Sequence, residues 1–204
     1  MTDAAAGGPD AIIATYQRLA ARFDALRDRS LFERDWLDAF AALLPPGGAM
    51  LDLGCGMGEP IAAHLAGLGF AVTGVDSAPA MIVLAAARHP SLCWRTADMR
   101  GLSLPRRFAG IIAWDSFFHL DADDQRAMFQ LVAAHAAPGA ALLFNTGPEA
   151  GTTIGALDDA PLFHASLAPD EYRALLQHHR FEVLRHVARD QNCGGRTVWL
   201  ARLT

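Results

Sequence analysis

The sequence predicts a single-domain α/β protein with a doubly wound, mostly parallel sheet. From residue 49 to residue 145, short apolar runs alternate with stretches of helical periodicity. The short runs are nearly continuous in apolar residues, as strands of a parallel sheet are when helices cover both faces. Near the C-terminus, two apolar runs are joined by a short turn-rich segment, which predicts an antiparallel pair at the end of the sheet.

Composition limits the classes of function. The 204 residues, 52% hydrophobic and 19% charged, suffice for one folded core. All 17 basic residues are Arg, because the chain has no Lys, and this excludes Lys Schiff-base and P-loop chemistry. The net charge is −5 and no basic stripe occurs, which argues against a nucleic-acid partner and favours a small-molecule substrate.

The cysteines and the N-terminus suggest a cytoplasmic location. Cys55, Cys93 and Cys193 are far apart and odd in number, so we expect reduced thiols rather than disulfides or a zinc site. Met1–Asp10 has no basic region followed by an apolar run, so no signal peptide is expected. The longest apolar runs are too short to span a bilayer, so we expect no membrane partner. The sequence contains no supporting cluster of metal ligands, so we expect no metal.

The first part of the chain reads as a helical cap and the rest as one globular unit. Apolar residues at helical spacing predict a helix over residues 12–44, which Pro45 ends. We therefore divide the chain into an N-terminal cap, 1–44, and a main domain, 45–204. Strands are predicted at 49–53, 70–75, 92–96, 108–114 and 140–145, and helices at 59–68, 78–88 and 121–136.

The C-terminal third departs from this alternation. A helix is predicted at 169–179, followed by strands at 181–188 and 197–203 that form the antiparallel pair. Residues 146–166 form the longest stretch without a regular pattern. We expect an irregular loop there, of the kind that serves as a lid or a substrate wall in such sheets.

The strongest functional signal is the glycine-rich turn after the first predicted strand. Asp52 precedes Gly54, Gly56 and Gly58, and Glu59 then begins a helix. Glycines at this junction allow a tight turn and let a ligand contact the main chain. The spacing differs from the G-x-G-x-x-G pattern that binds pyrophosphate, and Glu59 would repel a pyrophosphate. The turn favours a ligand with an ammonium group and a thioether or sulfonium; the alternative is a tight turn without a ligand.

Two further predicted strands end in acidic residues. Asp76 ends the second strand, where a carboxylate can accept both ribose hydroxyls of an adenosine, although it could also cap the next helix. Asp98 follows the third strand, where it can accept a hydrogen bond from an adenine amino group while Met99 packs on the ring. The alternative for this pair is a loop aspartate beside a core methionine.

This constellation resembles the class I S-adenosylmethionine-dependent methyltransferase family, most specifically in LDLGCGMG and VTGVDSAP. The resemblance implies a Rossmann-like, seven-stranded sheet with an antiparallel last strand and an N-terminal helical lid. It also implies methyl transfer from S-adenosyl-L-methionine, which leaves S-adenosyl-L-homocysteine. The glycine loop would hold the methionine moiety. The implied cofactor-binding residues are Tyr16, Asp52, Gly54, Cys55, Gly56, Gly58, Asp76, Ser77, Met81, Ala97, Asp98, Met99 and Asp115.

The resemblance places the segment after the fourth strand at the active site. His119 has an ordinary pKa near 6.5 and is a candidate general base, and Asp115 could serve as a base or orient the acceptor. Alternatively, His119 is a hydrogen-bonded wall residue, and Asp115 holds the cofactor or caps a turn. His164 could line the acceptor pocket. The segment departs from the Asn/Asp-Pro-Pro-aromatic motif of methyltransferases that act on DNA bases.

The sequence leaves two other classes of function open. One is an NAD(P)-dependent oxidoreductase on a similar sheet, against which the glycine spacing, Glu59 and the absence of Lys all argue. The other is a binding module that retains the cofactor pocket without catalysis. The methyl acceptor, the element that is methylated and the oligomeric state are not encoded in any motif that we recognise.

Overall fold

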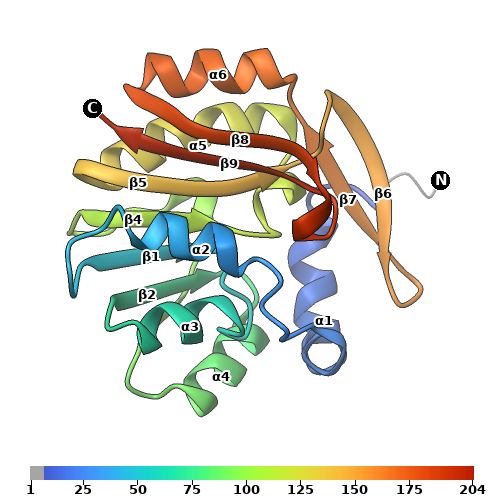
Figure 1. The fold of residues 1–204 in the computed structure, drawn as a ribbon. Coiled ribbons are helices and arrows are strands. Elements are labelled where there is room, and N and C mark those ends of the chain that lie inside the picture. Colours follow the sequence, from blue (N-terminus) through green and yellow to red (C-terminus); the bar gives the residue numbers. More distant parts are fainter. Residues whose placement is uncertain (1–6) are drawn as a thin grey trace.

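The computed structural model describes residues 7–204, so residues 1–6 of the predicted cap lie outside the described residues. The main sheet has seven strands in the order β3-β2-β1-β4-β5-β9-β8 (Figure 1). The first five strands are parallel, whereas β9 is antiparallel to both β5 and β8. The strands are β1 (Ala49–Leu53), β2 (Ala71–Asp76), β3 (Cys93–Thr96), β4 (Phe108–Ala113), β5 (Ala136–Thr146), β8 (Phe181–Asp190) and β9 (Arg196–Leu203). The predicted fold class is confirmed.

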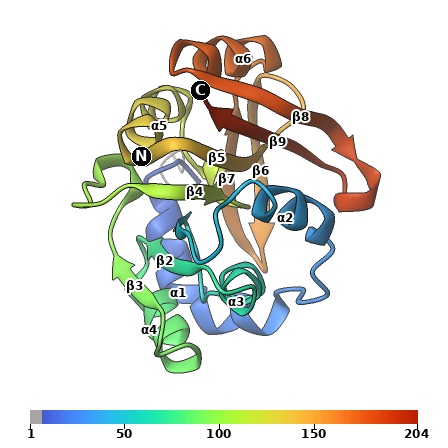
Figure 2. The same cartoon turned by 60° about the vertical axis from the view of Figure 1, so that its left-hand side comes forward.

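Helices cover both faces of this sheet (Figure 1 and Figure 2). The helices are α1 (Ala11–Leu26), α2 (Arg34–Ala41), α3 (Ile61–Gly67), α4 (Pro79–Arg88), α5 (Ala122–His135) and α6 (Pro169–His178). One apolar cluster joins α2 and α3 to the sheet, and another joins α5 and α6 to its opposite face. None of the helices within residues 7–204 has the length and apolar character needed to cross a bilayer.

The predicted helix over residues 12–44 is wrong in the middle, because α1 and α2 are separate helices. The chain leaves the helical conformation at Arg27, which is extended, and Leu31 has a φ of +58°. Helix α2 then packs into the core through Trp36, Leu37 and Phe40, each at most 1% exposed. Continuous apolar spacing concealed this break, because the break is held by polar contacts made far along the chain.

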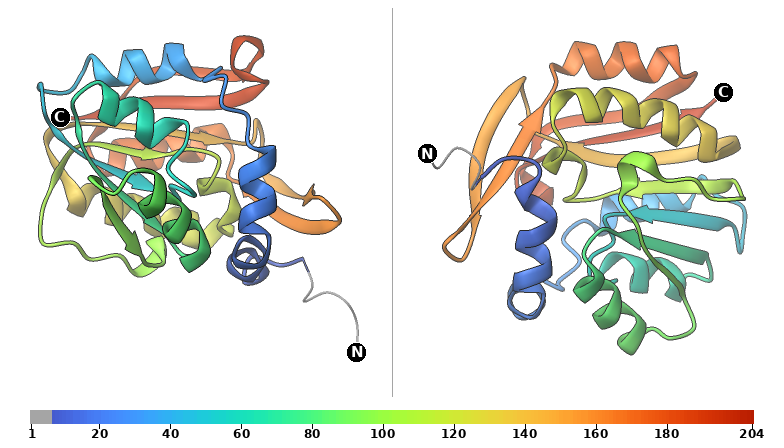
Figure 3. Two further views of the ribbon diagram at one scale, coloured as in Figure 1. Left: turned by 90° about the horizontal axis from the view of Figure 1, so that it is seen from below. Right: turned by 180° about the vertical axis from the view of Figure 1, so that it is seen from behind.

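The predicted irregular loop at 146–166 is also wrong, because most of it forms a β-hairpin. Strands β6 (Gly151–Leu157) and β7 (Ala160–Ser166) pair antiparallel as a two-stranded sheet separate from the main one. Most of β6 is exposed and its residues are small, so it lacks the apolar alternation that marks a half-buried strand. Figure 3 shows helix α1 between this hairpin and the strand ends of the main sheet.

Candidate functional site

A cavity lies between α1 and the carboxyl ends of β1, β2 and β4. Its wall contains His119 and every predicted cofactor residue except Gly58. The predicted residues on the wall are Tyr16, Asp52, Gly54, Cys55, Gly56, Asp76, Ser77, Met81, Ala97, Asp98, Met99 and Asp115. Gly58 instead faces Trp94, and a Cβ added at Gly58 would lie 2.6 Å from the Trp94 Cη2 atom. The position of Gly58 therefore indicates a packing role, and its contact with the cofactor stays a prediction.

The glycine loop presents bare backbone to the cavity. Gly54 and Gly56 have φ angles of +74° and +53°, which side-chain-bearing residues rarely adopt. A Cβ at Gly54 would lie 2.3 Å from the Ser116 Cβ atom, so this position also requires the absence of a side chain. The backbone N–H groups of Gly54 and Cys55 donate to the carbonyl of Val75 at 2.8 and 3.0 Å, which fixes the loop against β2.

Asp76 organises the loop from the end of β2. Its Oδ2 accepts from the N–H of Gly56 at 2.9 Å, and its Oδ1 accepts from the N–H of Ala78 at 2.8 Å. Burial raises the pKa of this carboxyl, while the two backbone N–H groups act in the opposite direction. Each oxygen keeps a second lone pair for a hydroxyl in the cavity. Asp76 thus braces the loop and still has acceptor capacity on the cavity wall.

Asp52 is a second buried carboxyl on the same wall, only 4% exposed. Burial and the neighbouring charge of Asp76 raise its pKa to about 7, against a smaller opposing effect of Arg27. Its carboxyl has no hydrogen-bond partner among residues 7–204. A cationic ligand in the cavity would stabilise the ionised form of Asp52.

Asp98 is already engaged by a neighbour. Arg100 contacts its carboxylate through Nη2 at 2.6 Å and through Nε at 3.0 Å, and the Arg100 N–H donates to it at 2.9 Å. The Arg100 hydrogen bonds hold the pKa of Asp98 below its ordinary value despite partial burial. The predicted adenine-binding carboxylate lies on the wall, but it shares its lone pairs with Arg100.

Asp115 is an anchored carboxylate. Its φ is +51°, and its carboxylate accepts from Arg196 through Nε and Nη2, both at 2.8 Å. Arg27 Nη1 contacts it at 3.1 Å, and Asn145 Nδ2 donates to it at 2.8 Å. Burial alone would raise the pKa of Asp115, but these contacts outweigh burial and lower it. Such a carboxylate stays ionised and is a weak proton acceptor, so the geometry favours an orienting role.

Sequence reasoning missed the arginines around Asp115. Arg27 lines the cavity and also contacts the buried Glu33 Oε1 at 3.3 Å, while Arg196 comes from β9. Burial raises the pKa of Glu33. These residues are separated by up to 169 positions in sequence, between Arg27 and Arg196, so no local spacing could reveal the cluster. Its effect is to fix the α1–α2 linker to the ends of β4 and β9.

His119 links the cavity wall to the helix above it. Its Nδ1 lies 2.9 Å from the carbonyl oxygen of Phe163, and its Nε2 lies 2.9 Å from the hydroxyl of Tyr16. Because a carbonyl only accepts, Nδ1 carries the proton and Nε2 accepts from Tyr16. Burial lowers the pKa of His119 to about 4, and burial raises the pKa of Tyr16. Both nitrogens of this neutral imidazole are therefore occupied.

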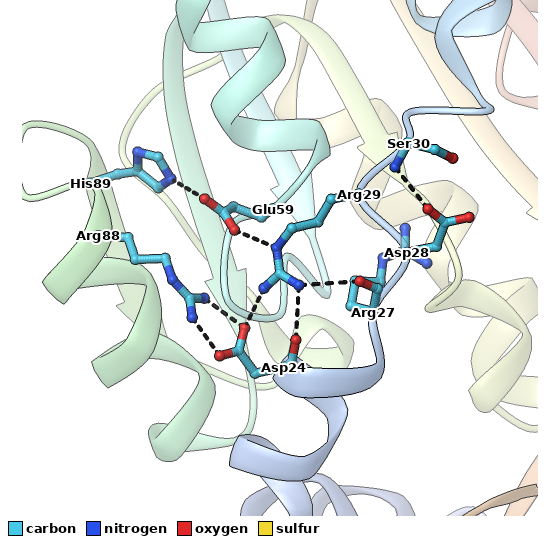
Figure 4. Close-up of polar contacts among 8 residues, drawn as sticks. All are labelled: Asp24, Arg27, Asp28, Arg29, Ser30, Glu59, Arg88 and His89. Carbon is cyan, nitrogen blue, oxygen red and sulfur yellow. Dashed lines mark hydrogen bonds and ion pairs between the residues drawn. The ribbon is translucent and has the colours of Figure 1, made fainter.

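A network of charged residues fixes the end of α1 to the glycine loop and to α4 (Figure 4). Asp24 accepts from Arg88, including a 2.7 Å contact from Nη1, and from Arg29 Nη2 at 2.6 Å. Arg29 Nε donates to Glu59 at 2.7 Å, and the Glu59 carboxylate lies 3.3 Å from His89 Nε2. We call these five residues the α1 latch. Arg29 therefore belongs to the latch and does not line the cavity.

A second cavity adjoins the first. Residues 147–150, the start of β6, strand β7 and the turn before β9 form its wall, which includes His164, Phe118 and Arg196. Asp115 lines both cavities, so the two meet at its side chain. An acceptor in the second cavity would approach a ligand in the first beside Asp115.

Comparison with known proteins agrees with this geometry. The family profile described as "Methyltransferase domain" matches residues 50–139. The Bacillus subtilis (strain 168) protein YqeM, a methyltransferase by name, is 35% identical over 91 residues, which are 43% of this chain and 36% of YqeM. The match thus spans little more than a third of that relative.

Solved structures share the fold over nearly the whole chain. The DhpI complex with S-adenosylhomocysteine has a TM-score of 0.76 at 21% identity and covers 97% of both chains. Magnesium protoporphyrin IX methyltransferase from Synechocystis PCC 6803 has a TM-score of 0.73 at 18% identity over 100% of both. CalS10, an amino pentose methyltransferase from Micromonospora echinaspora, has a TM-score of 0.71 at 21% identity over 92% of this chain and 96% of CalS10. Residues 50–139 thus match a methyltransferase-domain profile, and the chain has the fold of these solved methyltransferases, in agreement with the predicted resemblance to the class I S-adenosylmethionine-dependent methyltransferases.

Proposed function

We propose that this chain transfers a methyl group from S-adenosyl-L-methionine to a small-molecule acceptor. The observation that carries the proposal is the charge of the cofactor cavity. Five carboxylates line it, and its two arginines are each paired with carboxylates. The charged lining residues are Arg27, Asp52, Glu59, Asp76, Asp98, Arg100 and Asp115. This wall favours a ligand with an ammonium and a sulfonium over one with a pyrophosphate, which argues against an NAD(P)-dependent oxidoreductase.

The residues present fit the adenosyl amino acid. Asp76 would accept the ribose hydroxyls, Asp52 would pair with the ammonium, and Arg27 would meet the carboxylate. Asp98 would accept from the adenine amino group. When bound, the cofactor supplies a methyl group on a positively charged sulfur, whose leaving form is a neutral thioether. The chain itself contributes orientation and exclusion of water.

Helix α1 is proposed to act as the lid. Ile12, Ile13, Tyr16 and Phe23 line the cavity from this helix, and this position supports a movement of α1 when a ligand enters or leaves. The lid ends before α2, because α2 is part of the core. The second cavity is proposed as the acceptor chamber. A net charge of −5 and three unpaired cysteines support a small-molecule substrate and a cytoplasmic location.

Calorimetric titration with S-adenosyl-L-homocysteine tests the proposal, with NADH as the matched control. We expect binding of the first compound at one site and none of the second. No uptake of S-adenosyl-L-homocysteine would refute the assignment. Transfer of a labelled methyl group to small acceptors then separates an enzyme from a binding module. In that assay, His119→Ala is expected to lower turnover while cofactor binding remains intact.

A further inference from the structure

His164 occupies a distinctive place between the two cavities. It lies on β7, half-buried, and lines the second cavity together with Asp115. Its ring centroid is 4.7 Å from that of Phe118 and 5.0 Å from that of His119. His119, in turn, lines the first cavity. The two imidazoles thus stand on either side of the boundary, with His164 on the side of the acceptor chamber.

The two histidines differ in the state of their nitrogens. Both nitrogens of His119 are hydrogen-bonded, to Tyr16 and to the backbone of Phe163. Neither nitrogen of His164 has a hydrogen-bond partner within the described part of the chain, residues 7–204. An imidazole with a free lone pair that faces a substrate chamber can take a proton. An imidazole whose lone pair accepts from a tyrosine cannot do so unless the lid opens.

We propose that His164 is the general base that removes the proton from a hydroxyl or amine acceptor bound in the second cavity. This assignment rests on the proposed function. The heteroatom of the acceptor attacks the methyl carbon, and the bond from that carbon to sulfur breaks with its electron pair left on sulfur. The acceptor proton passes to the free nitrogen of His164, which becomes an imidazolium. The substrate class is therefore a protic acceptor, as opposed to a carboxylate that is already ionised.

The charges around His164 suit this role. Burial lowers its pKa, so it is neutral near pH 7, and the negative charge of Asp115 favours the protonated form when a proton arrives. The ring of His119, in the turn after β4, faces His164 and is itself hydrogen-bonded to Tyr16 of α1. Asp115 and the arginines paired with it are the nearby charged groups. His164 in turn disfavours a second proton on His119. A proton on His164 therefore makes protonation of His119 less favourable.

The hairpin positions this base. Gly155 on β6 lies beneath the ring, because a Cβ there would be 2.8 Å from the His164 Cε1 atom. Gly155→Ala therefore displaces the imidazole without removing it. The same strand β7 supplies the Phe163 carbonyl that fixes the tautomer of His119. One strand thus sets both histidines at the boundary.

Nitrogen-15 NMR of histidine rings in the complex with S-adenosyl-L-homocysteine tests the assignment without a known acceptor. We expect the pKa of His164 to lie below its ordinary value, because of burial, and both neutral tautomers to be present. We expect His119 to remain a single Nδ1–H tautomer until a lower pH. Adding phenol as a protic probe should shift the His164 titration and leave exposed His178 unchanged. A fixed tautomer at His164, or phenol-insensitive titration, would overturn the proposal.

Kinetics with labelled methyl donor add a second arm, with catechol and tyramine as protic probes and benzoate as the ionised control. His164→Gln should lower transfer to the protic probes by about 10²–10⁴-fold and abolish the loss of rate at acid pH. Gly155→Ala should lower the rate and keep the acid limb, while His178→Gln should match the wild type. Full activity of His164→Gln, or transfer to benzoate alone, would contradict the proposal. If no probe is methylated, the NMR titration alone decides whether His164 is the base. Failure to bind S-adenosyl-L-homocysteine would instead refute the proposed function itself.

Discussion

The α1 latch provides a direct test of the lid. Asp24→Asn removes the carboxylate that holds both Arg88 and Arg29, whose side chains are 31% and 37% exposed. Exposed ion pairs contribute about 0.2–1 kcal/mol each, and the bidentate contact from Arg88 lies toward the upper end. Loss of both pairs should therefore favour lid opening by about 1–2 kcal/mol. This difference corresponds to roughly a 5- to 30-fold change in the closed-to-open ratio.

Stopped-flow release of S-adenosyl-L-homocysteine measures this change. We expect the dissociation rate of Asp24→Asn to rise by roughly 5- to 30-fold at low salt, since about 1.4 kcal/mol is a factor of ten. In about 1 M salt the Debye length falls to about 3 Å, so the wild-type rate should approach that of the variant. Asp123→Asn, which breaks an exposed pair with Arg126 on α5, is the matched control. Equal release rates at low salt, or a salt-independent wild type, would refute the latch.

Three further predictions concern the cavity wall and the glycine loop next to it. Asp76→Ala should weaken S-adenosyl-L-homocysteine affinity at least about tenfold by calorimetry, because charge-assisted hydrogen bonds are lost; unchanged affinity would remove the ribose assignment. Because the pKa of Asp52 is raised to about 7, its ionised fraction should rise about tenfold from about pH 6 to about pH 8. The affinity for the ammonium group of the ligand should rise with it, and Asp52→Asn should make that affinity nearly independent of pH. Gly58→Ala, whose Cβ would meet Trp94, should lower the free energy of unfolding measured in urea by about 2–4 kcal/mol. Gly47→Ala is the control, because its φ is also positive but no atom lies within 4 Å of the added Cβ, and it should lose about 1 kcal/mol. Equal losses would contradict the packing argument.

Local patterns in the sequence were sufficient for the sheet and for the glycine loop. The buried strands are nearly continuous apolar runs, and the segment from the end of β1 to the end of β2 contains the glycine loop and Asp76. The roles of individual residues in the site stay predictions, but the structure brings all of them except Gly58 to one wall. Parallel strands make this convergence predictable, because their carboxyl ends meet at one edge of a sheet.

Features that depend on long-range contacts could not be predicted. The break between α1 and α2 at Arg27 is held by contacts of Arg27 with Asp115 and Glu33. Asp115 is in turn hydrogen-bonded by Arg196. The hairpin β6–β7 lacks a clear period because one of its strands is mostly exposed. In each case the cause is a partner distant in sequence or the solvent, and neither leaves a periodic signal in the amino-acid order.

The β6–β7 hairpin forms a structural unit separate from the main sheet. Strands β6 and β7 share no backbone pairing with the seven-stranded sheet, and β6 is mostly exposed, so its side chains can change with little consequence for the folding of the rest, whereas β7 is mostly buried. Three hydrogen bonds near the hairpin would have to be kept in any such change. The carbonyls of Phe163 and Ala165 accept from His119 and Gln125, respectively. The Ser166 hydroxyl accepts from the N–H of Gly147. A grafted hairpin that preserves these contacts offers a way to change the proposed acceptor chamber while leaving the proposed binding site for the methyl donor intact.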